Sequence, residues 1–334
     1  MKSEDKIVGI TFSHQTCRIC GNDDPEPICR QTIPKKVLGN GAGLKETFIV
    51  RCRCCGFYYL DPMPVEGLEE LYDDNYFVGA SDKWREKRRV VDVRKRFQMI
   101  SKHVSGPKPR FLEVGCGPGL GIQEAFRRKW QVYGQDVTDV FAQTLREKYN
   151  AEIYIGELDQ AGYDDNFFDV VYLDSVIEHV PDPEKMLKEI ERILKPGGSI
   201  YIITPNADAL INGFRDLLLK ILGRKKTTRI SGLEQPYHIT GFTRSSFKTM
   251  CDNNGRKIKR FQIYSGWNEW RKHTDRGLNV LLRYLLLYFP VHLTGEIIGK
   301  GITIEALISK SNRQQAVSTL RLQTRFSMTQ TKRG

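Results

Sequence analysis

The chain of 334 residues lacks an apolar run long enough to cross a lipid bilayer. Its apolar stretch at residues 278–291 is interrupted by Arg283 and Pro290. Residues 1–15 are charged and polar, without the apolar segment of a secretory signal peptide. Because eight cysteines accompany this N-terminus, we expect a reducing, cytoplasmic setting without disulfides, in which peripheral contact with a membrane stays open.

Acidic residues are scarcer than basic ones. The chain has 52 lysines and arginines against 40 acidic residues, a formal net charge of +12. The basic residues gather at 83–96, 215–229 and 256–260, and residues 313–334 contain no acid. This charge favours an anionic partner, such as a phosphate-bearing substrate, nucleic acid or lipid head groups. Nucleic acid is the weaker prediction, because the basic runs lack interleaved aromatic residues that stack on bases.

One segment, FLEVGCGPGLG at residues 111–121, combines a β-prone run, an acidic residue and a cluster of glycines before a helical pattern. Gly115, Gly117 and Gly119 allow positive φ and close approach of the backbone to a ligand. The helix start behind them offers free N–H groups. The third glycine lies one residue early for the dinucleotide pattern, and Leu120 replaces its small residue, so NAD is disfavoured.

Two carboxylates near this turn indicate a cationic ligand. Glu113 precedes the first glycine and could hold an ammonium group directly or through water. Asp136 ends the next expected strand, where a carboxylate can accept both ribose hydroxyls of an adenosyl group.

Strands and helices alternate after this turn, which predicts an α/β fold with a doubly wound, mostly parallel sheet. We expect parallel strands at residues 110–114, 131–135, 153–155, 168–174 and 199–204, a strand at 259–264 and a final antiparallel strand at 301–309. Thr138 is the predicted cap of the second helix of this unit.

Two C-x-x-C-G turns near the N-terminus predict a structural zinc site. The ligands would be Cys17, Cys20, Cys52 and Cys55, and Cys54 could take the place of a neighbour. Four cysteine ligands leave no open position for substrate, so the metal would fold a module too small to build a core. The remaining cysteines, Cys29, Cys116 and Cys251, are expected to be small buried apolar residues.

The segment E-V-G-C-G-P-G at residues 113–119 resembles the first motif of class I S-adenosylmethionine-dependent methyltransferases. The resemblance extends to the T-P-N sequence at residues 204–206 and implies a seven-stranded, Rossmann-like sheet that binds S-adenosylmethionine. The cofactor-binding residues that it implies, together with the two carboxylates above, are Glu113, Gly115, Cys116, Gly117, Gly119, Asp136, Val137, Glu157, Leu158 and Asp174.

A histidine follows the fourth strand, where a hydroxyl or an activated carbon acceptor would need a base that titrates near neutrality. His179 is therefore the predicted base, and the pair Glu178–His179 resembles the catalytic pair of sugar C-methyltransferases. The arrangement of C-x-x-C-G, D-P-x-P and a Tyr-Phe pair also resembles zinc-bearing methyltransferases of this kind, which implies that Tyr76 reaches the active site.

The same segment has a second resemblance, to the E-V-x-E-H sequence of ubiquinone-pathway and small-RNA 2′-O-methyltransferases, in which a divalent metal is held. Ser175 replaces the first glutamate here, which leaves Glu178, His179 and a third candidate ligand, His238. This metal stays an alternative.

The expected organisation has six parts. They are a zinc-binding module at residues 1–64, a helical connector at 65–107, a SAM-binding core at 108–206, a lid at 207–247, the strands that complete the sheet at 248–310 and a disordered basic tail at 311–334. The prediction is a SAM-dependent methyltransferase for a sugar or other small polar acceptor, with linkage of that acceptor to a nucleotide or lipid phosphate left open. An RNA methyltransferase and a non-catalytic protein that keeps the fold are the alternatives. The oligomeric state is not predicted.

Overall fold

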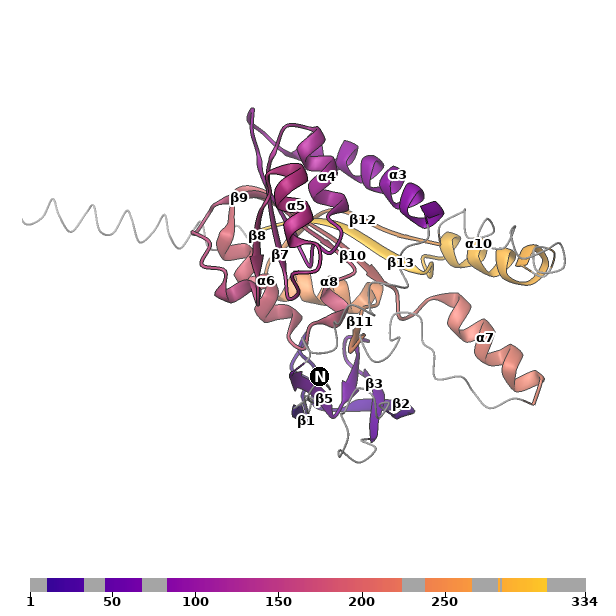
Figure 1. The fold of residues 1–334 in the computed structure, drawn as a ribbon. Helices are drawn as coiled ribbons and strands as arrows, with labels where there is room; N and C mark the ends of the chain where they lie inside the picture. Colours follow the sequence, from indigo (N-terminus) through magenta and orange to yellow (C-terminus); the bar gives the residue numbers. More distant parts are fainter. Residues whose placement is uncertain are drawn as a thin grey trace, which may run out of the picture.

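The computed structural model describes residues 11–32, 46–67, 83–223, 238–265, 282 and 284–310, and its centre is a sheet covered by helices on both faces (Figure 1). The seven strands have the order β12-β13-β10-β9-β6-β7-β8. Their bounds are β6 Arg110–Val114, β7 Gln131–Asp136, β8 Glu152–Ile155, β9 Phe168–Asp174, β10 Leu194–Pro205, β12 Lys257–Tyr264 and β13 Thr303–Ser309. Neighbouring strands are parallel from β10 to β8, and β13 is antiparallel to both β10 and β12. The predicted seven-stranded, mostly parallel sheet is confirmed.

The central strands β6 and β9 are buried on both faces of the sheet, in keeping with their largely apolar sequences. Successive side chains point to opposite faces. Phe111 and Val170 therefore belong to one core cluster, and their neighbours Leu112 and Val171 belong to another.

Helices cover each cluster (Figure 1). On one face lie α3 (Lys83–Ile100), α4 (Leu120–Arg127) and α5 (Ala142–Tyr149), which contribute Val93, Ile122 and Leu145 to the core. On the other face lie α6 (Pro183–Ile193) and α8 (Arg244–Asn253), which contribute Leu187 and Phe247.

The predicted cap at Thr138 is wrong. Helix α5 starts later, with Phe141 at the N-cap position and no side-chain cap. The Thr138 hydroxyl instead donates a hydrogen bond to Asp136 Oδ1 at 3.2 Å. A threonine after an aspartate can cap either its own turn or a helix, and here it closes the turn after β7.

The N-terminal region forms two small sheets that share the core of the large one. Strand β1 (Thr11–Ser13) pairs with β5 (Met63–Glu66), while β2 (Pro25–Thr32), β3 (Glu46–Cys52) and β4 (Tyr58–Asp61) join β11 (Thr240–Gly241). Phe57, Tyr59 and Met63 belong to the same cluster as Leu112 of β6 and Phe247 of α8. We expected a module without a core of its own, and the structure gives it a shared one.

Two helical segments project from one end of the molecule (Figure 1). They are α7 (Leu210–Ile221) and α10 (Phe289–Ile297), the second preceded by the π-helical turn η6 (Tyr284–Tyr288). The rings of Phe214 and Tyr288 pack with centroids 6.2 Å apart, and Leu210 N donates to Lys300 O at 2.9 Å. Among the described residues, no helix combines the length and the apolar character needed to cross a bilayer.

Candidate active site

The glycine turn joins β6 to α4 at the carboxyl edge of the sheet. Gly115, Gly117 and Gly119 have φ values of 58°, 44° and 70°. A Cβ atom added to Gly115 would lie 2.7 Å from Val176, and one added to Gly119 would lie 2.4 Å from Leu145. At Gly117 an added Cβ would meet no heavy atom within 4 Å, so the middle of the turn faces open space.

Glu113 binds the start of α4, next to this turn. Its carboxylate is buried and accepts hydrogen bonds from Gly121 N at 3.1 Å and Ile122 N at 2.8 Å. Burial raises the pKa of Glu113 to about 8, against the two N–H groups, which favour the ionised form. Both oxygens thus accept from the first turn of α4, and the expected contact of Glu113 with a ligand ammonium group, directly or through water, stays a prediction.

Gly121 is a residue that sequence analysis missed. An added Cβ would lie 2.9 Å from the carboxylate of Glu113, so a side chain there would displace that group. The signal was present in the sequence, as a fourth glycine in the same segment.

Asp136 lies beside the same turn, at the end of β7. Its Oδ2 accepts from Gly117 N at 2.8 Å, and its Oδ1 accepts from Thr138 N at 3.0 Å. The side chain of Gln135 is another missed residue, because it donates to Gly156 O at 2.6 Å and accepts from Gly115 N at 3.4 Å. The structure therefore brings Glu113 and Asp136 to one turn, as the cofactor prediction requires.

The other predicted cofactor residues line the same edge with different exposures. Val137 is half-buried directly after Asp136. Glu157 is the N-cap of the 3-10 turn η3 (Leu158–Gln160), and Leu158 is buried. Cys116 is buried as well, and burial raises the pKa of its thiol, so only its backbone is available at the turn.

Asp174 ends β9 and is paired with a half-buried arginine, Arg96, that sequence analysis missed. Arg96 of α3 donates to Asp174 Oδ2 at 2.9 Å and to the Tyr172 hydroxyl at 3.2 Å. Its Nε also lies 3.6 Å from Glu305 Oε1 of β13. Burial raises the pKa of Glu305 to about 7, which Arg96 opposes. Arg96 was only one of many basic residues in its helix, so no local pattern marked it.

The predicted base lies in a short turn after β9. His179 ends η4 (Ile177–His179), and its ring lies 4.5 Å from that of His238, centroid to centroid, at 85°. One ligand atom from each of Glu178, His179 and His238 lies within 4.8 Å of the others. This is the juxtaposition that the alternative of a divalent metal requires, and three ligands leave coordination positions open.

Glu178 is fully buried, and its Oε2 accepts from Thr204 Oγ1 at 3.0 Å. Burial raises the pKa of Glu178 to about 8. Its backbone oxygen accepts from Ile239 N at 3.1 Å, which ties η4 to the segment beside His238. The side chain of Glu178 is thus buried beside His179, and its catalytic role stays a prediction. Tyr76, the third predicted catalytic residue, lies outside the described residues.

Strand β4 of the N-terminal region contacts residues next to this site. The Tyr58 hydroxyl of β4 donates a hydrogen bond to Oδ1 of Asp208, which lies shortly after β10, at 3.2 Å. Burial raises the pKa of Tyr58 to about 12. Leu60 N donates to Ile239 O at 3.1 Å. These contacts join residues far apart in the sequence, so sequence analysis missed them.

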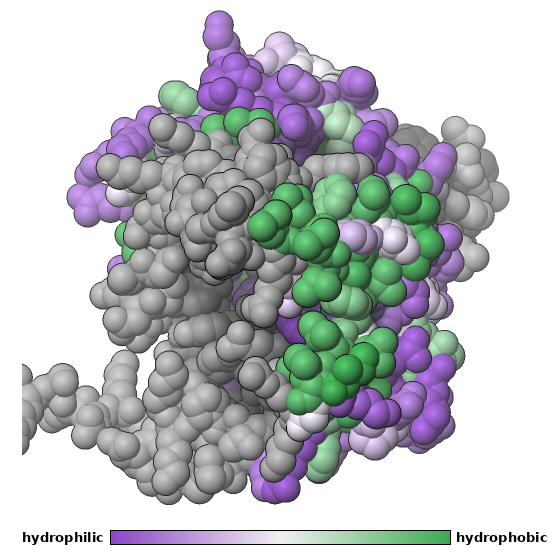
Figure 2. All heavy atoms as spheres, turned by 90° about the vertical axis from the view of Figure 1, so that its right-hand side faces the viewer, coloured by the Kyte–Doolittle hydropathy of each residue, from purple (hydrophilic) through white to green (hydrophobic). Residues whose placement is uncertain are grey.

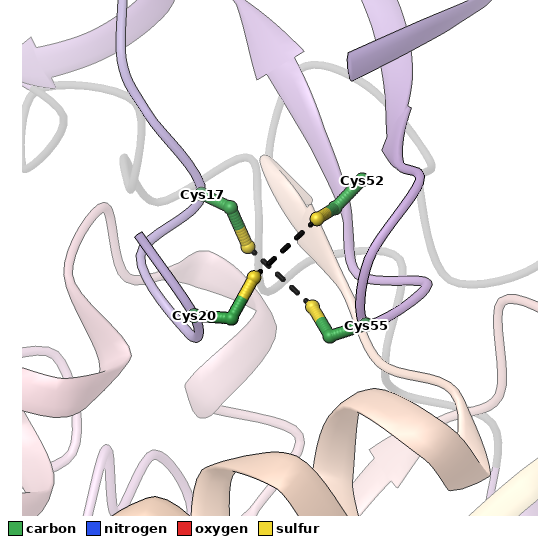
Figure 3. Close-up of side chains that lie close together, drawn as sticks. All are labelled: Cys17, Cys20, Cys52 and Cys55. Carbon is green, nitrogen blue, oxygen red and sulfur yellow. Dashed lines mark hydrogen bonds between the residues drawn. The ribbon is translucent and has the colours of Figure 1, made fainter. Parts of the chain in front are cut away.

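The four predicted zinc ligands converge on one point (Figure 3). Their sulfur atoms lie within 4.8 Å of one another, with Cys17–Cys55 and Cys20–Cys52 distances of 3.5 Å. Tetrahedral zinc with bonds of about 2.3 Å separates its sulfur ligands by about 3.8 Å, so the set fits this ion. Gly21 and Gly56, at φ values of 74° and 77°, follow each pair. Cys54 is exposed and outside the cluster.

Residues 112–202 match the family model described as a methyltransferase domain. This part of the chain is thus similar to methyltransferase domains. The match begins within β6, covers β7, β8 and β9 and ends within β10, so it includes the glycine turn, Asp136 and His179. The matched residues thus include the carboxyl-edge site.

Two curated relatives have methyltransferase names. The ubiquinone biosynthesis O-methyltransferase of Coxiella burnetii is 26% identical over 133 residues, which are 38% of this chain and 55% of that protein. The demethylmenaquinone methyltransferase of Bacillus mycoides is 29% identical over 142 residues, 40% of this chain and 54% of that protein. The chain therefore spans about half the length of these relatives.

Solved structures are also similar. The PH0226 protein from Pyrococcus horikoshii OT3 is 13% identical, with a TM-score of 0.47, over 72% of this chain and all of that one.

Proposed function

We propose that the chain is an S-adenosylmethionine-dependent methyltransferase for a small polar acceptor. The observation that carries the proposal is the placement of Asp136 beside the open middle of the glycine turn, at Gly117, inside the matched methyltransferase domain. The names of the relatives support methyl transfer and leave the acceptor open.

The residues at the edge suit this cofactor. The half-buried carboxylate of Asp136 would accept from the ribose hydroxyls, and the amides of the glycine turn would lie against the amino-acid part. Asp174, kept in place by Arg96, adds negative charge where a cationic group would bind. When bound, S-adenosylmethionine supplies a methyl group that is activated by its positively charged sulfur.

In this proposal, the residues of the chain position the two reactants and accept a proton. The glycine turn would hold the cofactor in place, and alignment of the two reactants removes much of the barrier. His179 would accept the proton that the acceptor loses, while Glu178 and Ile239 hold its turn in place. The acceptor class that we favour is a sugar or similar hydroxyl-bearing molecule with a phosphate, because the net charge is +12.

The cysteines complete the proposal. Cys17, Cys20, Cys52 and Cys55 would hold a structural zinc ion that fixes the N-terminal sheet against the site. Four thiolates fill a tetrahedral site, so this ion would take no part in the reaction.

Calorimetry with S-adenosylmethionine tests the cofactor site. We expect the native chain to bind, and Asp136→Ala to bind about tenfold to a hundredfold more weakly, because a charged hydrogen-bond acceptor is lost. Asp164→Ala removes an exposed carboxylate from a loop and should bind as the native chain does. No binding by the native chain would favour a non-catalytic protein with this fold.

Mass spectrometry of extracts incubated with the protein and methyl-labelled cofactor would then identify the acceptor. With that acceptor, His179→Ala should bind the cofactor normally and transfer the methyl group at least about a hundredfold more slowly. An undiminished rate would exclude His179 as the base.

A further inference from the structure

The projecting helical pair carries an exposed apolar surface. Figure 2 shows apolar side chains gathered on this end of the molecule. Its most exposed members are Ile297, Leu286 and Ile221, at 76%, 73% and 72%. We call it the α7–α10 face, and it consists of Leu217, Ile221, Leu222, Leu285, Leu286, Leu287, Ile297 and Ile298. Monomeric soluble proteins seldom expose so many large aliphatic side chains together, so the face is expected to contact something apolar.

The charges beside this face have one sign. Among the described residues 210–223 and 284–300, the exposed charged side chains are Lys220 and Lys300. The acidic residues of the two helices, Asp216 and Glu296, are half-buried, and Glu296 accepts from Ser265 N at 3.2 Å. In the sequence, Arg-Lys-Lys at residues 224–226 follows α7 after Leu222 and Gly223. An apolar face flanked by lysines complements a surface that is apolar inside and anionic outside.

We propose that the α7–α10 face rests on an anionic lipid surface, a role that goes beyond the proposed methyl transfer. The aliphatic side chains would enter the boundary between head groups and acyl chains, and Lys220 and Lys300 would lie among the head groups. The helices lie in the interface rather than cross it, in keeping with their length and composition. A second copy of the chain is a poorer occupant, because each copy has a net charge of +12 and self-association would bring these charges together.

Vesicle flotation of the full chain tests the proposal without any assay of activity. The probes are vesicles of phosphatidylcholine alone and vesicles of phosphatidylcholine mixed with phosphatidylglycerol. We expect the native chain to float with the mixed vesicles and to bind neutral vesicles at least about tenfold more weakly. The variant with Leu286→Ser and Ile297→Ser should lose at least about tenfold in binding to mixed vesicles. Lys220→Gln and Lys300→Gln should each lose about fivefold.

The control is Phe126→Ser on α4, which removes a side chain that is 45% exposed and lies over the sheet rather than on the projecting pair. It should float as the native chain does, and circular dichroism shows whether each variant is folded. Failure of the native chain to float, or equal binding to both kinds of vesicle, would overturn the proposal. So would a native dimer in sedimentation that Leu286→Ser and Ile297→Ser convert to a monomer, since the face would then be occupied by a second copy.

Discussion

Two acidic side chains at the candidate site are engaged by the protein itself. Glu113 bonds the first turn of α4, and Asp174 bonds Arg96. A third, Asp136, also accepts hydrogen bonds from the protein, from Gly117 N and Thr138 N, and it is the carboxylate that lies beside the open part of the turn. Sequence analysis found the residue types at this edge correctly, because the motif marks the turn. It could not show which carboxylate is buried, since burial depends on how α4 packs.

The buried Glu113 predicts a pH dependence of stability. Its pKa in the folded chain is raised to about 8, so the folded state keeps a proton that the unfolded chain releases near its ordinary pKa of about 4.5. The contribution of protonated Glu113 to the free energy of unfolding is thus largest at low pH. It is lost as pH rises from about 4.5 to about 8, by at most about 1.4 kcal/mol per pH unit.

Glu113→Gln removes the titrating carboxyl group. It also removes one of the two oxygens that accept hydrogen bonds from the N–H groups of α4. We expect the variant to be less stable than the native chain near pH 5 and to close the gap as pH approaches 8, measured by urea unfolding at several pH values. Parallel stability curves for the two proteins would show that Glu113 is already ionised throughout this range.

At the scale of elements, strands were more predictable than helix ends. The predicted strands at residues 110–114 and 168–174 agree with β6 and β9, because a strand buried on both faces is a conspicuous apolar run. The start of α5 was wrong, since Thr138 has a competing hydrogen-bond partner in Asp136. Strand β11 could not be predicted, because a two-residue strand depends wholly on its partner β4.

Helix α8 begins with a reciprocal cap between Thr243 and Ser246. The Thr243 hydroxyl accepts from Ser246 N at 3.1 Å, and Ser246 Oγ accepts from Thr243 N at 2.9 Å. We expect Thr243→Ala to lower the free energy of unfolding by about 1–2 kcal/mol. Ser245→Ala, at an exposed position in the same turn, should change it by less than about 0.5 kcal/mol. Equal effects of the two substitutions in urea unfolding would exclude the cap as a source of stability.

Across the whole molecule, the N-terminal region and the large sheet are connected by packing and by hydrogen bonds. Phe57 contacts Phe242 with ring centroids 5.1 Å apart, and Asn253 of α8 donates to Ile19 O at 3.0 Å. The two residues of each pair are far apart in the sequence, so no local pattern predicts their contact. The prediction of a domain boundary at residue 64 therefore did not anticipate these contacts. The spacing of the cysteines, in contrast, is local within each pair and predicted the four sulfurs that meet, with Cys54 left open as a replacement for a neighbour.

This shared core predicts that loss of zinc destabilises the whole molecule. We expect the native chain to contain about one zinc ion, and Cys55→Ser to contain none and to unfold at a temperature lower by more than about 5 °C. Because Cys52 and Cys55 belong to the same core as the large sheet, the variant should still unfold in a single transition by calorimetry. Cys54→Ser, which alters the exposed neighbour, should keep both the zinc and the melting temperature. Two separate transitions in Cys55→Ser, the upper one unchanged from the native chain, would instead show that the N-terminal region folds independently of the methyltransferase domain.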